Sequence, residues 1–373
     1  MLSQSGLTLI LIIEAIKYIA EFVLAFFKRE ATDAYCAQDV TVIFSCKNES
    51  EFITKTITSA LLANRFCRHI IVVDDFSTDS TYECAMKAFT FRDNVKVIRR
   101  SSGTPGKFHA QQEGLKHVTT NYVMFVDGDC IIPADFFIPY SITNASAVSF
   151  RVKPVLTSPL NFVERYQVYE YEKAYIAKTA HSIKGVNCCI SGAAGLFHTE
   201  TLKTIMKEHN GIFHGDDLQT TLLFQKHGHR VDHCNVSIST DVPKTLWRFL
   251  RQRALSWNVG GHLNAKNWRK IVYSKNTSIW HRLVFAWEYL ALATDFAKLA
   301  FIGYCLIFEP WLLFMLYIWY VCLELTLYLI QFKRLNQGMH FWLLLPLIPL
   351  FGLLKVLTSC FAWFLHWKYR VKK

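Results

Sequence analysis

Acidic residues follow two short apolar runs in the first third of the chain. Asp74-Asp75 comes directly after residues 70–73, and Asp127-Gly128-Asp129 comes directly after residues 122–126. Apolar runs of this length are typical of buried strands, and open α/β sheets bind ligands beyond the carboxyl ends of their strands. Carboxylate oxygens at such an edge are suitable ligands for a hard divalent cation that also contacts phosphate groups. The pattern predicts a metal-assisted phosphate site at one edge of a sheet.

Three further segments carry groups that suit the same site. Gly103–Lys107 precedes a predicted helix, where glycines allow close backbone approach and the lysine brings a cation near phosphates. Its spacing differs from that of a Walker A loop. Asp216-Asp217 is another acidic pair, and a basic segment ends at Trp257. Acidic turns also cap helices and loop lysines are often solvated, so the order of the motifs is more informative than any one of them.

The elements that must position these groups alternate between strand and helix over residues 38–150. Such alternation predicts a mostly parallel sheet with helices on both faces. A second half, ending near residue 240, completes the same domain, and basic amphipathic helices are expected at 243–257 and 268–282 along a membrane surface. Strands are expected at 40–45, 70–73, 95–98, 122–126 and 148–156, and helices at 51–64, 80–89, 107–117 and 161–180.

Apolar residues are concentrated towards the ends of the chain. Of 373 residues, 52% are hydrophobic, which exceeds the usual share in a soluble domain. About 20 apolar residues are enough to cross the hydrocarbon core of a bilayer. Membrane helices are therefore expected at 283–308, 311–330 and 341–367, the last of them kinked or re-entrant at its prolines.

The N-terminal apolar segment, residues 7–27, also contains charged residues. Glu14, Lys17 and Glu21 recur at helical spacing and therefore share one stripe. Either that stripe faces a helical bundle, or the helix lies flat in the membrane interface. Length and apolarity favour a spanning helix, and the acidic residues disfavour a cleaved signal peptide.

Basic residues beside the apolar segments indicate orientation. Lys28-Arg29, Arg269-Lys270 and Lys333-Arg334 would lie in the cytoplasm, together with the central region. The basic tail 368–373 favours the same side, although one more simple crossing would place it outside, and the sequence leaves this open.

The net charge of +12, without a nucleic-acid-binding module, indicates attraction to anionic lipid and diphosphate and argues against a nucleic-acid partner. Eleven scattered cysteines predict free thiols in a reducing compartment.

Six motifs, taken in order, resemble those of family 2 GT-A glycosyltransferases. The last two are closer still to hyaluronan synthases, and chitin and cellulose synthases are similar relatives. The resemblance covers about residues 38–260, and the flanking apolar segments agree with integral-membrane polymerases of this kind. The motifs are Phe44–Glu49, Val72–Asp79, Gly106-Lys107, Phe125–Cys130 with Pro133, Cys189–Phe197 and Gly215–Asp217.

The resemblance implies how the donor would be held. Asp127 would contact the nucleotide, and Asp129 would ligate Mg²⁺ or Mn²⁺. The residues expected to hold the uridine and the diphosphate of a UDP-sugar are Glu49, Asp74, Asp75 and Lys107.

The resemblance also implies an acceptor site and a base. Ser191 and Gly192 would border the acceptor sugar, and Asp217, supported by Asp216, would deprotonate its hydroxyl. An inverting displacement requires such a base on one face of the anomeric carbon and a neutralised diphosphate on the other. It requires no protein nucleophile.

The chain departs from the family at its last motif, which usually reads Gln-x-x-Arg-Trp. Alignment on Trp257 places Arg253 at the Gln position and Ser256 at the Arg position. Alignment on Gln252 instead makes the spacing to Trp257 one residue too long. Arg251 or Arg253 would supply the missing cation, and Trp257 would stack on a sugar ring or simply lie at the bilayer edge. Because this motif is associated with processive synthesis, its change bears on processivity more than on transfer.

Together these features predict a multi-pass membrane glycosyltransferase of the plasma or inner membrane, which transfers UDP-GlcNAc or a related donor to a growing β-linked polysaccharide. One alternative is single transfer to a lipid or polyprenyl-phosphate acceptor, and another is an inactive membrane scaffold. Five regions are expected: a membrane helix (1–30), a cytoplasmic GT-A catalytic domain (38–242), interfacial amphipathic helices (243–282), about three transmembrane helices (283–367) and a basic tail (368–373).

Overall fold

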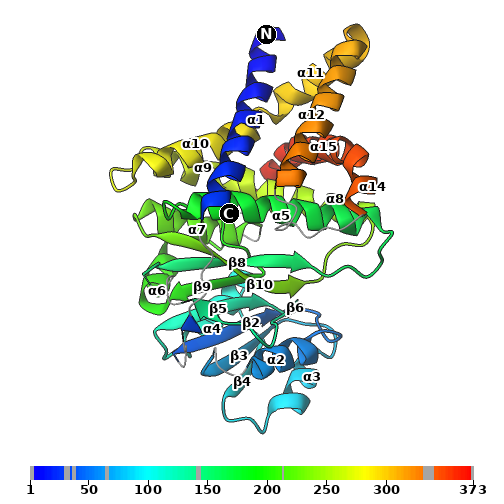
Figure 1. Ribbon diagram of the computed structural model, residues 1–373. Helices are drawn as coiled ribbons and strands as arrows, with labels where there is room; N and C mark the ends of the chain where they lie inside the picture. The colour runs from blue at the N-terminus through cyan, green and yellow to red at the C-terminus, as the bar shows by residue number, and fades with distance from the viewer. Residues whose placement is uncertain are drawn as a thin grey trace.

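A computed structural model describes residues 4–28, 34–35, 39–63, 67–139, 144–211, 214–330 and 340–370. Figure 1 shows a twisted sheet flanked by helices at one end of the molecule. Helices α5 and α8 lie across one side of this sheet domain, and α1, α11 and α12 project away beyond them. Arg29, Lys333, Arg334 and residues 371–373, on which part of the predicted orientation depends, lie outside the described residues.

The main sheet has eight strands in the order β4-β3-β2-β5-β9-β8-β10-β6. Strands β4, β3, β2 and β5 are mutually parallel, β9 runs antiparallel between β5 and β8, and β8 is parallel to β10. The predicted mostly parallel sheet is therefore confirmed. The strands are β2 (Val40–Cys46), β3 (His69–Asp75), β4 (Val95–Arg100), β5 (Tyr122–Asp127), β6 (Cys130–Ile131), β8 (Ala147–Pro154), β9 (Ala194–His198) and β10 (Val231–Thr240), with a separate antiparallel pair formed by β1 (Ala34–Tyr35) and β7 (Ile138–Pro139).

Helices cover both faces of the parallel half, because successive strand residues point to opposite faces. Ile70 and Val72 pack with apolar residues of α2 (Ile53–Leu62) and α3 (Thr81–Phe89). Ile71 and Val73 pack on the other face with α4 (Lys107–Leu115). Two further helices complete the domain, α6 (Thr199–Glu208) and α7 (Asp216–Lys226).

A layer of helices separates the sheet from the apolar C-terminal region. Helix α5 (Phe162–Ser182) begins at the cap Asn161, whose side chain accepts from the backbone N–H groups of Val163 and Glu164. Helix α8 (Leu246–Gln252) continues as a π-helix (Arg253–Val259) and then as α9 (Gly260–Val272).

The helix expected over 268–282 is not continuous. Helix α9 ends at Val272, and α10 (Ile279–Ala293) begins after a polar turn. The Thr277 hydroxyl donates to the carbonyl oxygens of Ile271 and Ser274, both at 2.9 Å, and this closes the turn. Local side-chain-to-backbone bonds of this kind compete with the helix, and the periodicity of the segment does not reveal them.

Two helical segments, Pro310–Leu329 and Trp342–His366, are long and apolar enough to cross a membrane. They match the predicted segments 311–330 and 341–367. The predicted segment 283–308 is broken, because α10 and α11 (Asp295–Phe308) meet at a 46° bend. If this bent pair is one span, the described residues contain three candidate spans. The remaining helices are α12 (Pro310–Ile330), α14 (His340–Leu344) and α15 (Ile348–Arg370), with a short 3₁₀ turn at 345–347.

Helix α1 (Gln4–Phe27) is not among the candidate spans, since every 18-residue stretch of it contains three charged residues. These charges face other helices. Glu14 contacts Lys298 of α11 at 2.5 Å, and Lys17 contacts Glu288 of α10 at 2.5 Å. Of the two environments considered for this stripe, the structure has the one in which it faces a helical bundle.

Candidate active site

A cavity of about 980 Å³ lies at the carboxyl ends of β2, β3 and β5 and extends towards α5, the π-helix, α10 and α11. Most of the residues predicted to take part in the chemistry line this cavity, although they are spread along the sequence from Glu49 to Trp257. Asp74, Arg251 and Arg253 do not line it. Those that do are Glu49, Asp75, Lys107, Asp127, Asp129, Ser191, Gly192, Asp216, Asp217, Gln252 and Trp257.

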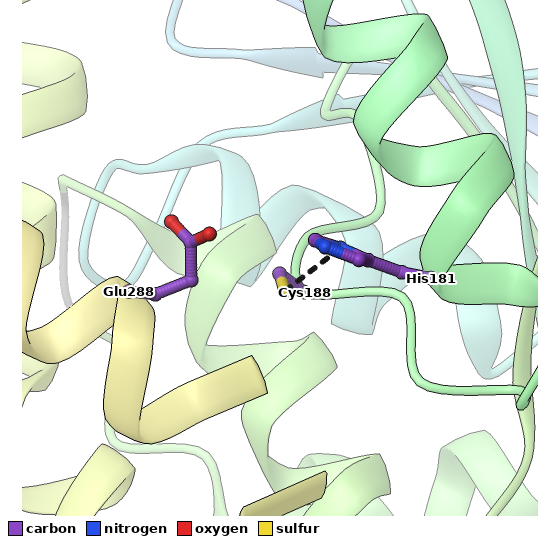
Figure 2. A group of neighbouring side chains, drawn as sticks. All are labelled: His181, Cys188 and Glu288. Carbon is purple, nitrogen blue, oxygen red and sulfur yellow. Dashed lines mark hydrogen bonds between the residues drawn. The ribbon is translucent and has the colours of Figure 1, made fainter. Parts of the chain in front are cut away.

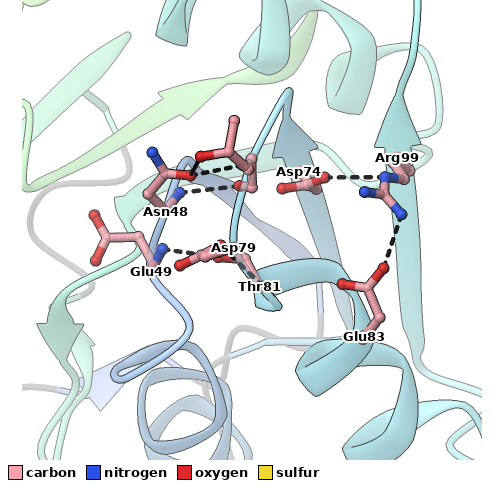
Figure 3. Close-up of polar contacts among 9 residues, drawn as sticks. Asn48, Glu49, Asp74, Asp79, Thr81, Glu83 and Arg99 are labelled. Atoms are coloured by element: carbon pink, nitrogen blue, oxygen red, sulfur yellow. Dashed lines mark hydrogen bonds and ion pairs between the residues drawn. The ribbon is translucent and has the colours of Figure 1, made fainter.

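Glu49 is held in the cavity wall by the loop after β3. Asn48 adopts a positive φ of 58°, and its side-chain oxygen accepts from the backbone N–H of Thr78 at 2.8 Å. The backbone N–H of Glu49 donates to the Thr81 hydroxyl at 2.8 Å, and Asp79 accepts from the N–H of Thr81 at 3.0 Å (Figure 3). The Asp-x-x-Ser-Thr-Asp turn thus joins two loops as well as beginning α3.

The adjacent carboxylates Asp74 and Asp75 face opposite sides of β3. Asp75 is buried, forms an ion pair with Arg100 and accepts the backbone N–H of Gly106 at 2.6 Å. Asp74 points to the α3 side, where its closest charged contact is Arg99 at 3.7 Å (Figure 3). The predicted donor-binding role of Asp74 is therefore not supported, because strand alternation turns it away from the cavity.

Lys107 and Gly192 connect the two acidic sides of the cavity. The Lys107 Nζ contacts Asp127 Oδ1 at 2.5 Å and donates to the Gly192 carbonyl oxygen at 2.9 Å. The backbone N–H of Gly192 donates in turn to Asp217 Oδ2 at 3.1 Å. Although burial alone would lower it, the pKa of Lys107 is raised by Asp127 and Asp216, so the side chain stays cationic.

Glu49 and Asp129 form an acidic cluster with Asp127. Burial and the neighbouring carboxylates of Asp129 and Asp127 raise the pKa of Glu49 to about 7. Burial and Asp127 raise the pKa of Asp129 to about 6. Burial therefore disfavours the charged forms of both carboxyls, and their mutual repulsion adds to that effect.

Asp216 and Asp217 form the first turn of α7. Gly215 precedes them with φ of 76°, and a Cβ there would lie 2.7 Å from the Cα of Gly260 at the start of α9. Glycine is required at this contact, which sets the acidic turn directly against α9. Burial, together with Asp217, raises the pKa of Asp216 to about 6, against the opposing effect of Lys107.

His209 supports this turn and was not predicted from the sequence. Its Nε2 lies 3.0 Å from the Asp216 carbonyl oxygen, and its Nδ1 accepts the backbone N–H of Gly211 at 3.1 Å. A carbonyl oxygen can only accept, so the proton is on Nε2. The ring stacks on Phe108 with centroids 4.1 Å apart, and burial lowers the pKa of His209 to about 4. The sequence offers no local signal for this role.

Helix α5 lines the cavity with residues that were also missed. Tyr171, Tyr175 and Lys178 recur at i, i+4 and i+7 and therefore share one helical face. Lys178 donates to the Ser149 hydroxyl at 3.4 Å, and that oxygen also accepts the backbone N–H of Ser191 at 3.2 Å. The spacing is visible in the sequence, but an aromatic stripe of this kind is equally typical of a buried helix face.

The last motif lies across the junction of α8 and the π-helix. Gln252 and Trp257 both line the cavity, although they are five residues apart.

Arg253 is buried, donates to Glu170 at 2.9 Å through Nε, and lies with its guanidinium 3.8 Å from the Trp257 ring centroid. Arg251 is exposed outside the cavity. The expectation that either arginine supplies a cation to the cavity is therefore not supported. Lys355 of α15, paired with Glu170 at 2.7 Å, does line it.

A second polar cluster joins the sheet domain to α1 and α10. Figure 2 shows His181 of α5 facing Cys188, with Glu288 of α10 nearby. The His181 Nδ1 lies 3.3 Å from the Cys188 sulfur, and its Nε2 lies 2.8 Å from Glu21. Lys17 contacts both Glu288 and Glu21, at 2.5 and 3.3 Å, and already supplies a cation to these carboxylates. These contacts join α1, α5 and α10 to one another.

Comparisons with known proteins identify the family. The family model described as "Glycosyltransferase like family 2" matches residues 37–260. The chain is 24% identical over 230 residues to the poly-beta-1,6-N-acetyl-D-glucosamine synthase of Staphylococcus aureus and 25% identical over 237 residues to that of Staphylococcus epidermidis. Each alignment covers 60% of this chain and 55% of the relative, so the chain spans about half the length of these curated proteins.

A solved structure shares the fold over most of its length. A mannosyltransferase from Pyrobaculum calidifontis, in complex with GDP-Man and Mn²⁺, aligns with a TM-score of 0.59 and 19% identity. The alignment covers 91% of this chain and 96% of the mannosyltransferase. The predicted GT-A fold is thereby confirmed. Because the family model covers more than half of the chain, this protein belongs to glycosyltransferase like family 2.

Proposed function

We propose that this protein is an inverting membrane glycosyltransferase that transfers a sugar from UDP-GlcNAc, or a related UDP-sugar, to a growing β-linked polysaccharide. The observation that carries the proposal is the connection from Asp127 through Lys107 and Gly192 to Asp217 across one cavity. It brings a cation suited to the diphosphate and a carboxylate suited to act as a base to the same part of the cavity, on either side of Gly192 in the chain of contacts. The named relatives, which are poly-beta-1,6-N-acetyl-D-glucosamine synthases, favour this sugar and a polysaccharide product.

Asp217 is the proposed general base. Its Oδ2 accepts only the Gly192 N–H, at 3.1 Å, among the bonds found in the described residues, and its Oδ1 accepts the N–H of Leu218 at 2.8 Å. Both donors are neutral backbone N–H groups, which orient the carboxylate and leave its charge in place. The carboxylate therefore remains able to accept the proton of an acceptor hydroxyl. Asp216 and His209 hold the turn on which Asp217 lies.

The donor diphosphate is proposed to bind between Lys107 and the acidic cluster. Lys107 supplies a fixed positive charge, and the bond between Asp75 and the Gly106 N–H orders the loop that carries it. Asp75 thus positions this loop as well as bordering the nucleotide. Asp127 contacts both the cation of Lys107 and the open cavity.

A divalent cation, Mg²⁺ or Mn²⁺, fits the same cluster. Asp129 is the proposed ligand, with Glu49 and Asp127 beside it, and all three offer only oxygen donors, as hard cations prefer. Burial, together with the neighbouring carboxylates, raises the pKa values of Glu49 and Asp129, and a bound cation would relieve the repulsion between these groups. When bound, the cation would neutralise charge on the departing diphosphate.

The acceptor is proposed to occupy the part of the cavity between Ser191, Gln252 and Trp257. The Trp257 side chain is 41% exposed, with the Arg253 guanidinium 3.8 Å and the Tyr171 ring 6.1 Å from its ring centroid, and we propose that its exposed part stacks on a sugar. The candidate spans at 310–329 and 342–366 support a multi-pass protein, and the predicted cytoplasmic position of the catalytic domain is retained in the proposal. The cysteines of the described residues are free thiols, as expected for a domain in a reducing compartment such as the cytoplasm, where the UDP-sugar donor would be available.

The proposal is tested by incubating purified protein with Mn²⁺ and a panel of UDP-sugars and following UDP release and product size. We expect UDP-GlcNAc to be consumed and a ladder or high polymer of β-linked sugar to form. One added sugar would instead support single transfer to a small acceptor. UDP release from none of the donors would overturn the enzymatic assignment and favour a scaffold.

A further inference from the structure

A second cavity, of about 1120 Å³, lies beside the first, and the proposed function places neither donor nor acceptor in it. It is bordered by the loop before α4, by one face of α9, and by the ends of α10, α11 and α15. The two cavities share Gly106, Lys107, His214, Asp216 and Leu292 in their walls. The second cavity therefore lies where the sheet domain meets the apolar helices.

The α9 side of this cavity is basic. Lys266 and Lys270 are one helical turn apart and project from the same face of the helix. Within the described ranges neither lysine forms an ion pair, and Asp216, at the shared wall, is the one acidic residue among those that line the cavity. Two exposed ammonium groups one turn apart, with no ion-pair partner among the described residues, suit a phosphate group.

The opposite side is apolar and aromatic. Phe296 of α11 and Trp363 of α15 line the cavity, with ring centroids 5.7 Å apart in an edge-to-face arrangement. They are 39% and 47% exposed, although both lie on the helices of the predicted membrane region. An exposed Trp at such a position is typical of the level where lipid headgroups meet acyl chains, and Phe296 extends the apolar wall beside it.

We propose that this second cavity binds a resident anionic phospholipid of the bilayer. Lys266 and Lys270 hold the headgroup phosphate, and the acyl chains leave along Phe296 and Trp363. Basic recesses between membrane helices are suited to anionic headgroups, whereas a free phosphate ion would leave the aromatic wall without a partner. Because α9 begins at Gly260, against Gly215 and the acidic turn of α7, a lipid bound here also secures the helix that supports Asp216 and Asp217.

The test uses the full chain in nanodiscs that contain equal amounts of phosphatidylcholine and phosphatidylglycerol. After extraction into neutral detergent, native mass spectrometry counts the lipids that stay bound to each chain. We expect one phosphatidylglycerol per chain and no retained phosphatidylcholine. The double variant K266E/K270E should lose retention by about tenfold or more, and Trp363→Ala should also weaken it.

The matched control reverses two basic residues of the same region that lie outside the cavity, Arg269 and Lys275. The variant R269E/K275E should retain the lipid as the wild type does. Equal loss in both double variants would mean generic surface attraction and would overturn the proposal, as would no retained lipid in the wild type. If K266E/K270E unfolds, K266Q/K270Q is measured against R269Q/K275Q with the same expectations.

A second arm identifies the role of the lipid. Radiolabelled UDP-GlcNAc is added to the nanodiscs, and the lipid fraction is extracted and counted. We expect no label on phosphatidylglycerol, and label there would make the lipid an acceptor and contradict a resident role. Lipid retention is measured without any sugar donor, so its outcome is independent of whether the protein proves to be a glycosyltransferase.

Discussion

Gln252 and Trp257 line the same cavity although five residues separate them, because the helix between them is a π-helix over Arg253–Val259. In an α-helix, residues five apart point about 140° away from each other. A π-turn, with bonds from i to i+5, brings them back into line and absorbs one extra residue. The chain thus presents both Gln252 and Trp257 to the cavity, with Ser256 immediately before the Trp.

The Trp257 ring should contribute to acceptor binding. We expect Trp257→Ala to lower the transfer rate at subsaturating oligosaccharide acceptor by about two- to tenfold, because loss of an aromatic stacking partner costs roughly 0.5–1.5 kcal/mol. The matched control is Trp247→Ala, since Trp247 lies on the preceding helix, 74% exposed and outside the cavity. Equal effects of the two substitutions in steady-state kinetics would contradict the acceptor role.

Asp74 and Asp75 should respond very differently to the same change. Asp75→Asn weakens a buried ion pair with Arg100 and the bond to the Gly106 N–H, so we expect a loss of roughly 1–3 kcal/mol of stability and a higher KM for UDP-sugar. Asp74→Asn should leave KM unchanged, because Asp74 faces away from the cavity. Thermal unfolding and donor kinetics of both variants check this, and a raised KM in Asp74→Asn would restore its predicted donor role.

The close packing around Gly192 should make it intolerant of a side chain. A Cβ there would lie 3.0 Å from Lys107 Nζ and 3.1 Å from Asp217 Oδ2, so Gly192→Ala should displace one or both and lower kcat at least tenfold. Gly261 also lines the cavity, but its Cβ would meet no atom closer than 3.6 Å. Gly261→Ala should therefore retain activity. Equal kcat values for the two variants would contradict the proposed role of the contacts between Gly192, Lys107 and Asp217.

Metal binding should stabilise the protein more at high pH than at low pH. The pKa values of Glu49 and Asp129 are about 7 and about 6 in the folded protein, above their ordinary values of 4.5 and 3.8. These groups therefore contribute stability when protonated, and that contribution is lost as the pH rises through about 6–7. A divalent cation offsets the resulting repulsion only where the carboxylates are ionised.

We expect Mn²⁺ to raise the Tm clearly at about pH 8 and little at about pH 5, because protons compete with the metal at low pH. Differential scanning fluorimetry with and without Mn²⁺ at each pH measures this, and the other titrating groups cancel in the difference. Asp129→Asn should abolish the rise. The same rise at both pH values, or an unchanged rise in Asp129→Asn, would argue against this metal site.

Much of the sheet and the identity of the acidic residues were predictable because their signals are local. An apolar run followed by acids marks a strand end, and parallel strands bring such ends to one edge, as happens for Asp75 and Asp127. The sequence could not tell which of Asp74 and Asp75 faces the cavity. Strand alternation guarantees that one faces away, but the choice depends on which face of the sheet packs on α4.

Other features depend on tertiary packing that no short pattern encodes. The cavity-facing stripe of α5 is clear only once α5 lies over the sheet edge. The break of the predicted segment 283–308 at Thr294, whose hydroxyl donates to the Leu290 carbonyl oxygen at 2.9 Å, leaves little trace in hydropathy. The hyaluronan-synthase likeness, the site roles and the predicted region boundaries stay predictions.

The most direct test of the central claim is Asp217→Asn in the purified protein, assayed for UDP-GlcNAc turnover and for UDP binding with Mn²⁺. An amide cannot act as a base but keeps the shape that accepts the Gly192 and Leu218 N–H groups. We expect turnover to fall by about 10²–10⁴-fold, the usual contribution of general base catalysis, with UDP affinity changed less than a few-fold. Turnover close to that of the wild type would contradict the assignment of Asp217 as the base.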